Sequence, residues 1–168
     1  MSLRLRILTF AFLLSGISLV PTFSFAQLAT ASNTYLGIHG GYILPSQIPG
    51  VTEIMSVAGA RISFPQQVTW IELGLLDANA KGTTLYNANL SLKANIPLQS
   101  FYAFMLLGAD FTYYTPPNTG TSLSAPGGHV GAGLGTTISD AVHFRSEMRF
   151  NFNPGVTMDI LLGLEFQL

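Results

Sequence analysis

The fold is decided by the stretch VHFRSEMRFNF, residues 142–152. Its even positions are mainly apolar, and its odd positions from His143 to Asn151 are polar or charged. Successive side chains of a strand point to opposite faces, so this strand has one apolar and one charged face. In a soluble sandwich the charged face meets water, whereas in a membrane barrel the apolar face meets lipid and the charges lie inside. Because the chain opens with a secretion leader and closes on another alternating strand, we expect the barrel.

Residues 1–26 have the features of a cleavable signal peptide. Two arginines form a basic start, an apolar segment covers 7–20, and Ser24-Phe25-Ala26 is a cleavage site of the small-x-small type. A retained membrane anchor is the alternative, but small and polar residues at positions 15, 16 and 18 interrupt the apolar run. We therefore expect a signal peptide at 1–26 and one transmembrane barrel domain at 27–168.

The composition excludes several classes of partner and site. The absence of cysteine excludes disulfide bonds, a lipoprotein anchor and thiolate metal sites. The net charge is only -1 and no basic patch exists, so nucleic acid is not an expected partner. His39 and His129 lack the spacing of metal ligands, and Asp77–Gly82 is too short for a calcium loop. We expect no cofactor and no metal, and we interpret the histidines as lumen-filling or loop-edge residues.

Eight segments have the length of about 9–11 residues that a tilted membrane strand needs. We expect them at Tyr35–Ile43, Met55–Phe64, Val68–Leu76, Thr84–Ala94, Phe101–Tyr114, His129–Ile138, Val142–Phe152 and Val156–Leu168. The connections alternate between tight turns and longer loops, the longer ones being Leu44–Ile54, Asp77–Thr83 and Thr115–Gly128. Only Asn153–Gly155 breaks the alternation by being short. The predicted fold class is all-β, an eight-stranded antiparallel up-and-down transmembrane β-barrel, with the longer loops outside.

Charged residues share one parity along the strands, which predicts a charged lumen. We expect a structural salt-bridge network there, formed by Arg61, Glu72, Asp110, Arg145, Glu147, Arg149 and Asp159. If the turn at 139–141 pairs Ile138 with Val142, glycines at 131, 133 and 135 face three of these charges and leave room for them. If the turn at 153–155 pairs Phe152 with Val156, Arg149 faces Asp159. Since an eight-stranded barrel is filled by side chains, these charges must be paired.

The segment Gly127–Gly135, followed by a short turn and Val142–Phe150, resembles the penultimate hairpin of small outer-membrane β-barrels of the OmpA/OmpX/OmpW kind. The resemblance extends loosely from Tyr35 to Leu168. It implies residence in the outer membrane of a Gram-negative cell, contact with outer-membrane lipid, and insertion by the outer-membrane assembly machinery. That machinery is guided by an alternating last strand with a terminal aromatic residue. Here the last strand alternates, but the final residue is leucine.

Three classes of function follow from this interpretation. The first is a structural or surface-interaction barrel, whose loops Leu44–Ile54 and Thr115–Gly128 offer a contact surface for a ligand. The second is a conduit or binding site for small apolar molecules. The third is a lipid A-modifying hydrolase, suggested by His143, Ser146 and Glu147. A nucleophile must lie within hydrogen-bond reach of its base, but His143 and Ser146 are three residues apart and point to opposite faces. We therefore expect no enzymatic activity and favour the first class.

Overall fold

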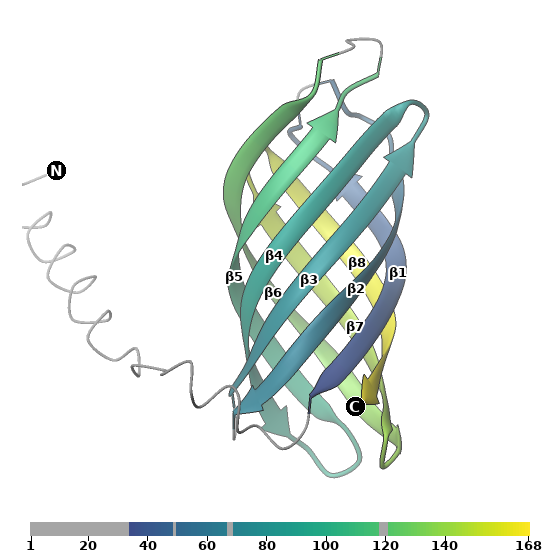
Figure 1. Ribbon diagram of the computed structural model, residues 1–168, viewed down its shortest axis with the longest axis vertical. Coiled ribbons are helices and arrows are strands. Elements are labelled where there is room, and N and C mark those ends of the chain that lie inside the picture. Colours follow the sequence, from purple (N-terminus) through teal and green to yellow (C-terminus); the bar gives the residue numbers. More distant parts are fainter. Residues whose placement is uncertain (1–33, 49, 67–68, 118–120) are drawn as a thin grey trace, which may run out of the picture. The chain divides into compact units, whose positions relative to one another are not determined.

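The computed structural model describes residues 34–48, 50–66, 69–117 and 121–168, which form eight β-strands (Figure 1). The strands are β1 (Tyr35–Pro45), β2 (Met55–Gln66), β3 (Thr69–Ala80), β4 (Thr83–Pro97), β5 (Tyr102–Thr115), β6 (Leu123–Ser139), β7 (Val142–Phe152) and β8 (Val156–Gln167). The predicted signal peptide at 1–26 lies outside the described residues. Within those residues, no helix has the length and hydropathy needed to cross a membrane.

The eight strands close into one antiparallel barrel. Each strand pairs with the next along the chain, and β1 pairs with β8 from Tyr35 opposite Gln167 to Pro45 opposite Thr157. In Figure 1 the purple β1 and the yellow β8 accordingly lie side by side. Closure satisfies the hydrogen bonds of every strand and removes sheet edges. The predicted fold class is confirmed.

The two ends of the barrel differ in their connections. One end, here called the terminal end, holds the start of β1, the end of β8 and the tight connections after β2, β4 and β6. The opposite end, here called the loop end, holds the connections 46–54, 81–82, 116–122 and 153–155. Two of these four are longer than three residues, and they lie within the predicted contact loops Leu44–Ile54 and Thr115–Gly128.

Side chains alternate between the lumen and the outer face along most of each strand. On β7, Arg145, Glu147 and Arg149 are buried, while Phe144, Met148 and Phe152 are exposed on the outside. The outer face is apolar around the barrel, with Leu75 and Met105 more than 60% exposed. A charged side chain in the middle of such a face would cost roughly 2–4 kcal/mol in a bilayer. This cost explains why the charged residues in the middle of the strands lie on the inner parity, whereas Asp77, on the outer parity, lies near the loop end of β3.

Two predicted boundaries are wrong, both at the loop end. The predicted longer loop Asp77–Thr83 is a two-residue turn, because β3 continues to Ala80 and β4 begins at Thr83. Lys81 and Gly82 occupy the turn with positive φ values of 35° and 88°, the geometry that suits the twist of a tight hairpin. Likewise β6 begins at Leu123 and not at His129, since its first residues pair with β5 despite Pro126.

The predicted register of the last two hairpins is correct over most of their length. Gly131, Gly133 and Gly135 face Arg149, Glu147 and Arg145. The pairing of Ile138 with Val142 is wrong, because the register shifts between Thr137 and Ser139 and Val142 pairs with Ser139. One extra residue in a strand next to a turn is a β-bulge, which changes the local pairing and leaves the rest of the ladder in place.

Candidate functional site

The centre of the lumen is a cluster of buried charges, which we call the charge cluster: Arg61, Glu72, Lys93, Arg145, Glu147, Arg149 and Glu165. Arg145 is its most connected cation. Its Nη1 atom donates to Glu72 Oε1 at 2.7 Å and to Glu165 Oε1 at 2.8 Å. Its Nη2 atom donates to Glu147 Oε2 at 2.6 Å. One side chain of β7 thus links strands on several sides of the barrel.

Glu147 is the corresponding hub among the anions. It accepts a hydrogen bond from Arg61 Nη1 at 2.8 Å and one from Arg145 Nη2 at 2.6 Å. Its other oxygen accepts from Arg149, at 2.9 Å from Nε and 2.6 Å from Nη2. Charge-assisted hydrogen bonds of this length are the strong ones, and a carboxylate buried among three guanidiniums is well compensated for its loss of hydration.

At the terminal end the charge cluster passes into an aromatic layer. Lys93 Nζ lies 2.9 Å from Glu72 Oε1 and 3.9 Å from the centre of the Trp70 ring. The Trp70 ring in turn stacks on Tyr35 at 5.1 Å between centres. The ammonium of Lys93 is fully buried, and the carboxylate and the ring face both favour its charge. Its place beside Trp70 was not predicted, because it depends on the register between β3 and β4, in which Trp70 is opposite Lys93.

The charge cluster includes five of the seven predicted network residues: Arg61, Glu72, Arg145, Glu147 and Arg149. Arg61 Nη1 lies 3.4 Å from Glu72 Oε2, as the short turn between β2 and β3 suggested. The remaining two, Asp110 and Asp159, are buried in the lumen but bind other partners. Lys93 and Glu165, whose parity also points inward, complete the cluster.

Arg149 and Asp159 are opposite each other, as the turn at 153–155 predicted, but their side chains bind elsewhere. Arg149 is directed to Glu147, and Asp159 accepts hydrogen bonds from Asn151 Nδ2 at 2.8 Å and Thr157 Oγ1 at 3.2 Å. The register of a strand fixes which residues are neighbours. It does not fix which of several acceptors a long arginine side chain selects.

Asp110 belongs to a hydrogen-bonded chain that sequence reasoning missed. His129 Nδ1 lies 2.9 Å from Asp110 Oδ1, and His129 Nε2 lies 2.8 Å from Ser91 Oγ. The three residues come from β4, β5 and β6, and Gly108 between them leaves space for the imidazole. This is the order of groups in a serine hydrolase triad. Because Ser91 is only 1% exposed in a filled lumen, however, the arrangement offers no reachable nucleophile.

The loop end of the lumen is closed by an apolar cluster, which we call the mouth cluster: Ile43, Ile48, Val51, Met55, Val57, Leu76, Ala78, Leu85, Tyr114 and Leu161. Ile48 and Val51 come from the loop 46–54 and are 4% and 5% exposed, so this loop folds into the barrel mouth. The cavity left beneath it measures about 20 Å³, enough for about one water molecule. The space that an apolar ligand would need is therefore filled by the protein's own side chains.

The residues considered for hydrolysis are not brought together. His143 faces inward, and its ring packs edge-on against Tyr35 at 5.3 Å. Ser146 lies on the other face, where its hydroxyl donates to the Leu134 carbonyl at 3.4 Å. Glu147 is occupied by three arginines. In the described ranges, no group of three or more histidine and acidic side chains is arranged to hold a metal ion.

Comparison with solved structures identifies outer-membrane barrels as neighbours in fold. Neisserial surface protein A matches with a TM-score of 0.71 at 11% identity, over 80% of this chain and 97% of that one. The N-terminal barrel domain of Pseudomonas aeruginosa OprF matches with a TM-score of 0.65 at 11% identity, over 81% and 97%. The Yersinia pestis outer membrane protein Ail matches with a TM-score of 0.50 at 12% identity, over 80% and 99%.

The sequence itself gives no further match: no protein-family model and no characterised protein matches it. At 11–12% identity, the structural likeness establishes the fold alone. This chain has the fold of the eight-stranded outer-membrane β-barrels. The predicted resemblance to small barrels of this architecture is confirmed at the level of fold.

Proposed function

We propose that the chain is an integral outer-membrane β-barrel of the structural or surface-interaction type, with the loop end outside the cell. The observation that carries the proposal is the blocked lumen beneath an apolar outer face. The charge cluster fills the middle, the aromatic layer covers the terminal end, and the mouth cluster seals the loop end. Such a barrel is anchored in lipid and offers its outer loops to partners.

The contact surface would be built from the loops 46–54 and 116–122. The first of these loops is held against neighbouring connections. The amide of Ser46 donates to the Val156 carbonyl at 2.8 Å, and Lys81 pairs with Glu53 at 3.1 Å. Ile54 and Leu123 leave apolar side chains exposed beside these loops, 60% and 45% respectively. A firmly positioned loop with exposed apolar residues suits recognition of a surface ligand.

We further propose that the seven predicted lumen residues, Arg61, Glu72, Asp110, Arg145, Glu147, Arg149 and Asp159, have a structural role. Five of them pair with one another across the barrel, while Asp110 is hydrogen-bonded to His129 and Asp159 to Asn151 and Thr157, so that each buried charge has a partner in the closed lumen. The buried Ser91 and the separated His143 and Ser146 support no catalytic role. Outer-membrane lipid and the assembly machinery remain the expected partners, and β8 carries the outward alternation from Met158 to Phe166 that such insertion is expected to need.

Conductance in planar bilayers tests the closed lumen. We expect purified, folded protein to produce no steady open channel, while a 16-stranded porin recorded in the same bilayers conducts, since barrels of that width leave an aqueous passage. Heat-modifiable migration on gels must first establish that the protein is folded. Steady conductance comparable to that of the porin would contradict the proposal and would favour the conduit class of function.

A further inference from the structure

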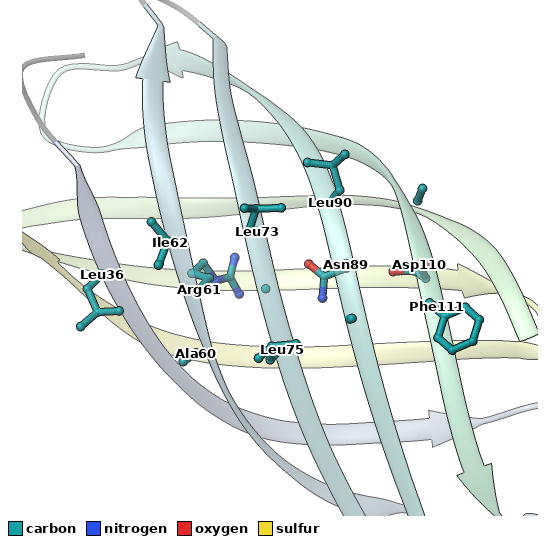
Figure 2. A pocket seen from close by; sticks show the side chains of 13 residues that line it. Leu36, Ala60, Arg61, Ile62, Leu73, Leu75, Asn89, Leu90, Asp110 and Phe111 are labelled. Atoms are coloured by element: carbon teal, nitrogen blue, oxygen red, sulfur yellow. The ribbon is translucent and has the colours of Figure 1, made fainter. Parts of the chain in front are cut away.

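The outer face of the barrel is hollowed on one side, over β1 to β5 (Figure 2). The hollow, which we call the lateral groove, has a volume of about 620 Å³. Its apolar walls are Leu36, Ile62, Leu73, Leu75, Leu90 and Phe111. Arg61, Asn89 and Asp110 border it only from the lumen side, where their side chains are buried. The groove thus presents an apolar surface to the membrane, and its volume falls in the usual range of roughly 300–1,000 Å³ for ligand pockets.

The lateral groove exists because alanine replaces larger residues at outward positions. Ala60 pairs with Leu75, Leu75 pairs with Ala88, and Ala88 pairs with Phe111, so small and large side chains alternate across neighbouring strands. Ala109 lies two residues along β5 from Phe111 and deepens the hollow. By contrast, the outward residues of β7 and β8 are mostly large: Phe144, Met148, Phe150, Phe152, Ile160 and Leu162. Only part of the outer face is shaped in this way.

The groove continues toward the loop end and stops at polar side chains. A second hollow of about 520 Å³ shares Ala60, Leu75, Ala88 and Phe111 with the first, and its far wall includes Asp77, Tyr86 and Tyr113. Asp77 is exposed on the outer face, where Asn79 Nδ2 donates to its Oδ1 atom at 2.8 Å. Thr84 Oγ1 donates to Asn79 Oδ1 at 3.2 Å. An apolar channel with hydrogen-bonding groups at one end matches the two-part chemistry of a lipid.

We propose that the lateral groove is a binding site for one membrane lipid, whose acyl chain lies over Ala88 and Ala109 and whose head group faces Asp77. A head group with hydroxyl or ammonium donors suits this rim, because the Asp77 carboxylate is an acceptor. The site lies on the leaflet at the loop end, where tyrosines such as Tyr86 and Tyr113 mark the level of the head groups. This inference rests on the proposed placement in a membrane.

What binds in the groove is determined by how well its shape packs against the walls, because there is no hydrophobic driving force inside a bilayer. A chain lying in the groove can contact flanking side chains such as Leu75 and Phe111 as well as the alanines beneath it, whereas a chain on a convex part of the barrel contacts mainly what lies beneath it. The additional dispersion contacts are individually small but numerous. A second copy of the barrel would present another convex face, and its contact would stop at the leucine and phenylalanine walls. A single slender chain reaches Ala88, between the side chains of Leu75 and Phe111 on the neighbouring strands.

Native mass spectrometry of the folded protein, loaded with phosphatidylethanolamine and then washed with detergent, tests this site. Ala88→Phe fills the groove, and Ala132→Phe is the matched control, since Ala132 is also an exposed, outward alanine but lies on β6. We expect the wild type and Ala132→Phe to retain one lipid each, and Ala88→Phe to retain roughly tenfold less, equivalent to about 1.4 kcal/mol.

The outcomes separate this inference from the proposed function. Heat-modifiable migration of each variant shows whether the barrel has folded and inserted, and failure of the wild type there would count against the membrane placement itself. With folding intact, equal lipid retention by Ala88→Phe and Ala132→Phe would overturn the lipid site. A dimer peak that is lost only in Ala88→Phe would also overturn it, because the groove would then hold a second copy. If Ala88→Phe fails to fold, the smaller change Ala88→Leu against Ala132→Leu decides in the same way.

Discussion

At the scale of single residues, the carboxylate of Glu147 is the group on which most of the lumen depends. Three guanidiniums donate to it, from Arg61, Arg145 and Arg149. Glu147→Gln keeps the shape of the side chain but leaves buried cations without their counter-charge, so we expect a loss of roughly 3–5 kcal/mol in the free energy of unfolding. Urea titration in detergent, followed by the gel shift between folded and unfolded forms, measures it. The control Ser146→Ala, on the outer face, should change stability by less than about 0.5 kcal/mol.

A double-mutant cycle distinguishes the two partners considered for Arg149. Sequence reasoning pairs it with Asp159, whereas the structure directs it to Glu147 at 2.6 Å. We expect a coupling of roughly 1–3 kcal/mol between Arg149→Met and Glu147→Gln. We expect a smaller coupling between Arg149→Met and Asp159→Asn, because Asn151 and Thr157 already bind that carboxylate. The reverse order of the two couplings would show that the predicted pair, and not the observed one, carries the interaction.

The absence of a side chain at Gly108 leaves space for the imidazole of His129. A Cβ atom there would lie 2.4 Å from His129 Cε1 and 2.2 Å from the Leu90 carbonyl oxygen. Gly108→Ala should therefore displace His129 from Ser91 and Asp110 and cost about 1–3 kcal/mol, as overpacking of a filled interior usually does. At Gly128 the nearest atom would be 3.2 Å away, so Gly128→Ala is the matched control. Equal losses in the same urea titration would mean that the imidazole does not need this space.

At the scale of strands, alternation alone predicted eight segments and which face of each looks inward. It could not give the depth of a residue along the barrel. Ile43, Met55 and Leu76 share the inner parity with the charges, yet they gather in the mouth cluster. The side chains of Ile48 and Val51 enter the mouth because of the conformation of the loop 46–54, which the hydrophobic periodicity of the sequence cannot predict. Which of several acceptors a side chain such as Arg149 binds likewise depends on the packing of the lumen, and not on the register alone.

The connection between β3 and β4 was predicted to be longer than it is. Asp, Asn and Gly at 77–82 suggested a longer loop, but the two-residue turn needs positive φ only at Lys81 and Gly82. Gly82→Ala should destabilise the barrel by about 1 kcal/mol, because alanine must adopt a left-handed conformation there. The nearest atom to a Cβ at 82 is 3.9 Å away, so the expected loss comes from the backbone and not from crowding. Gly40→Ala, at a position without positive φ, should lose less in the same titration.

At the scale of the whole molecule, the loop end and the terminal end should lie on opposite sides of the outer membrane. The chain has no cysteine, so one introduced thiol reports a single position. Ser122 is exposed at the end of the loop 116–122, and Asp140 is exposed in the turn between β6 and β7 at the terminal end. With a maleimide that cannot cross membranes, we expect Ser122→Cys to be labelled on intact cells. We expect Asp140→Cys to be labelled only after the cells are opened, because its turn would face the periplasm. Labelling in the reverse order would show that the barrel has the opposite orientation. Recovery of either variant as a soluble periplasmic protein would contradict the membrane placement, on which the interpretation of the closed lumen, the contact loops and the lateral groove depends.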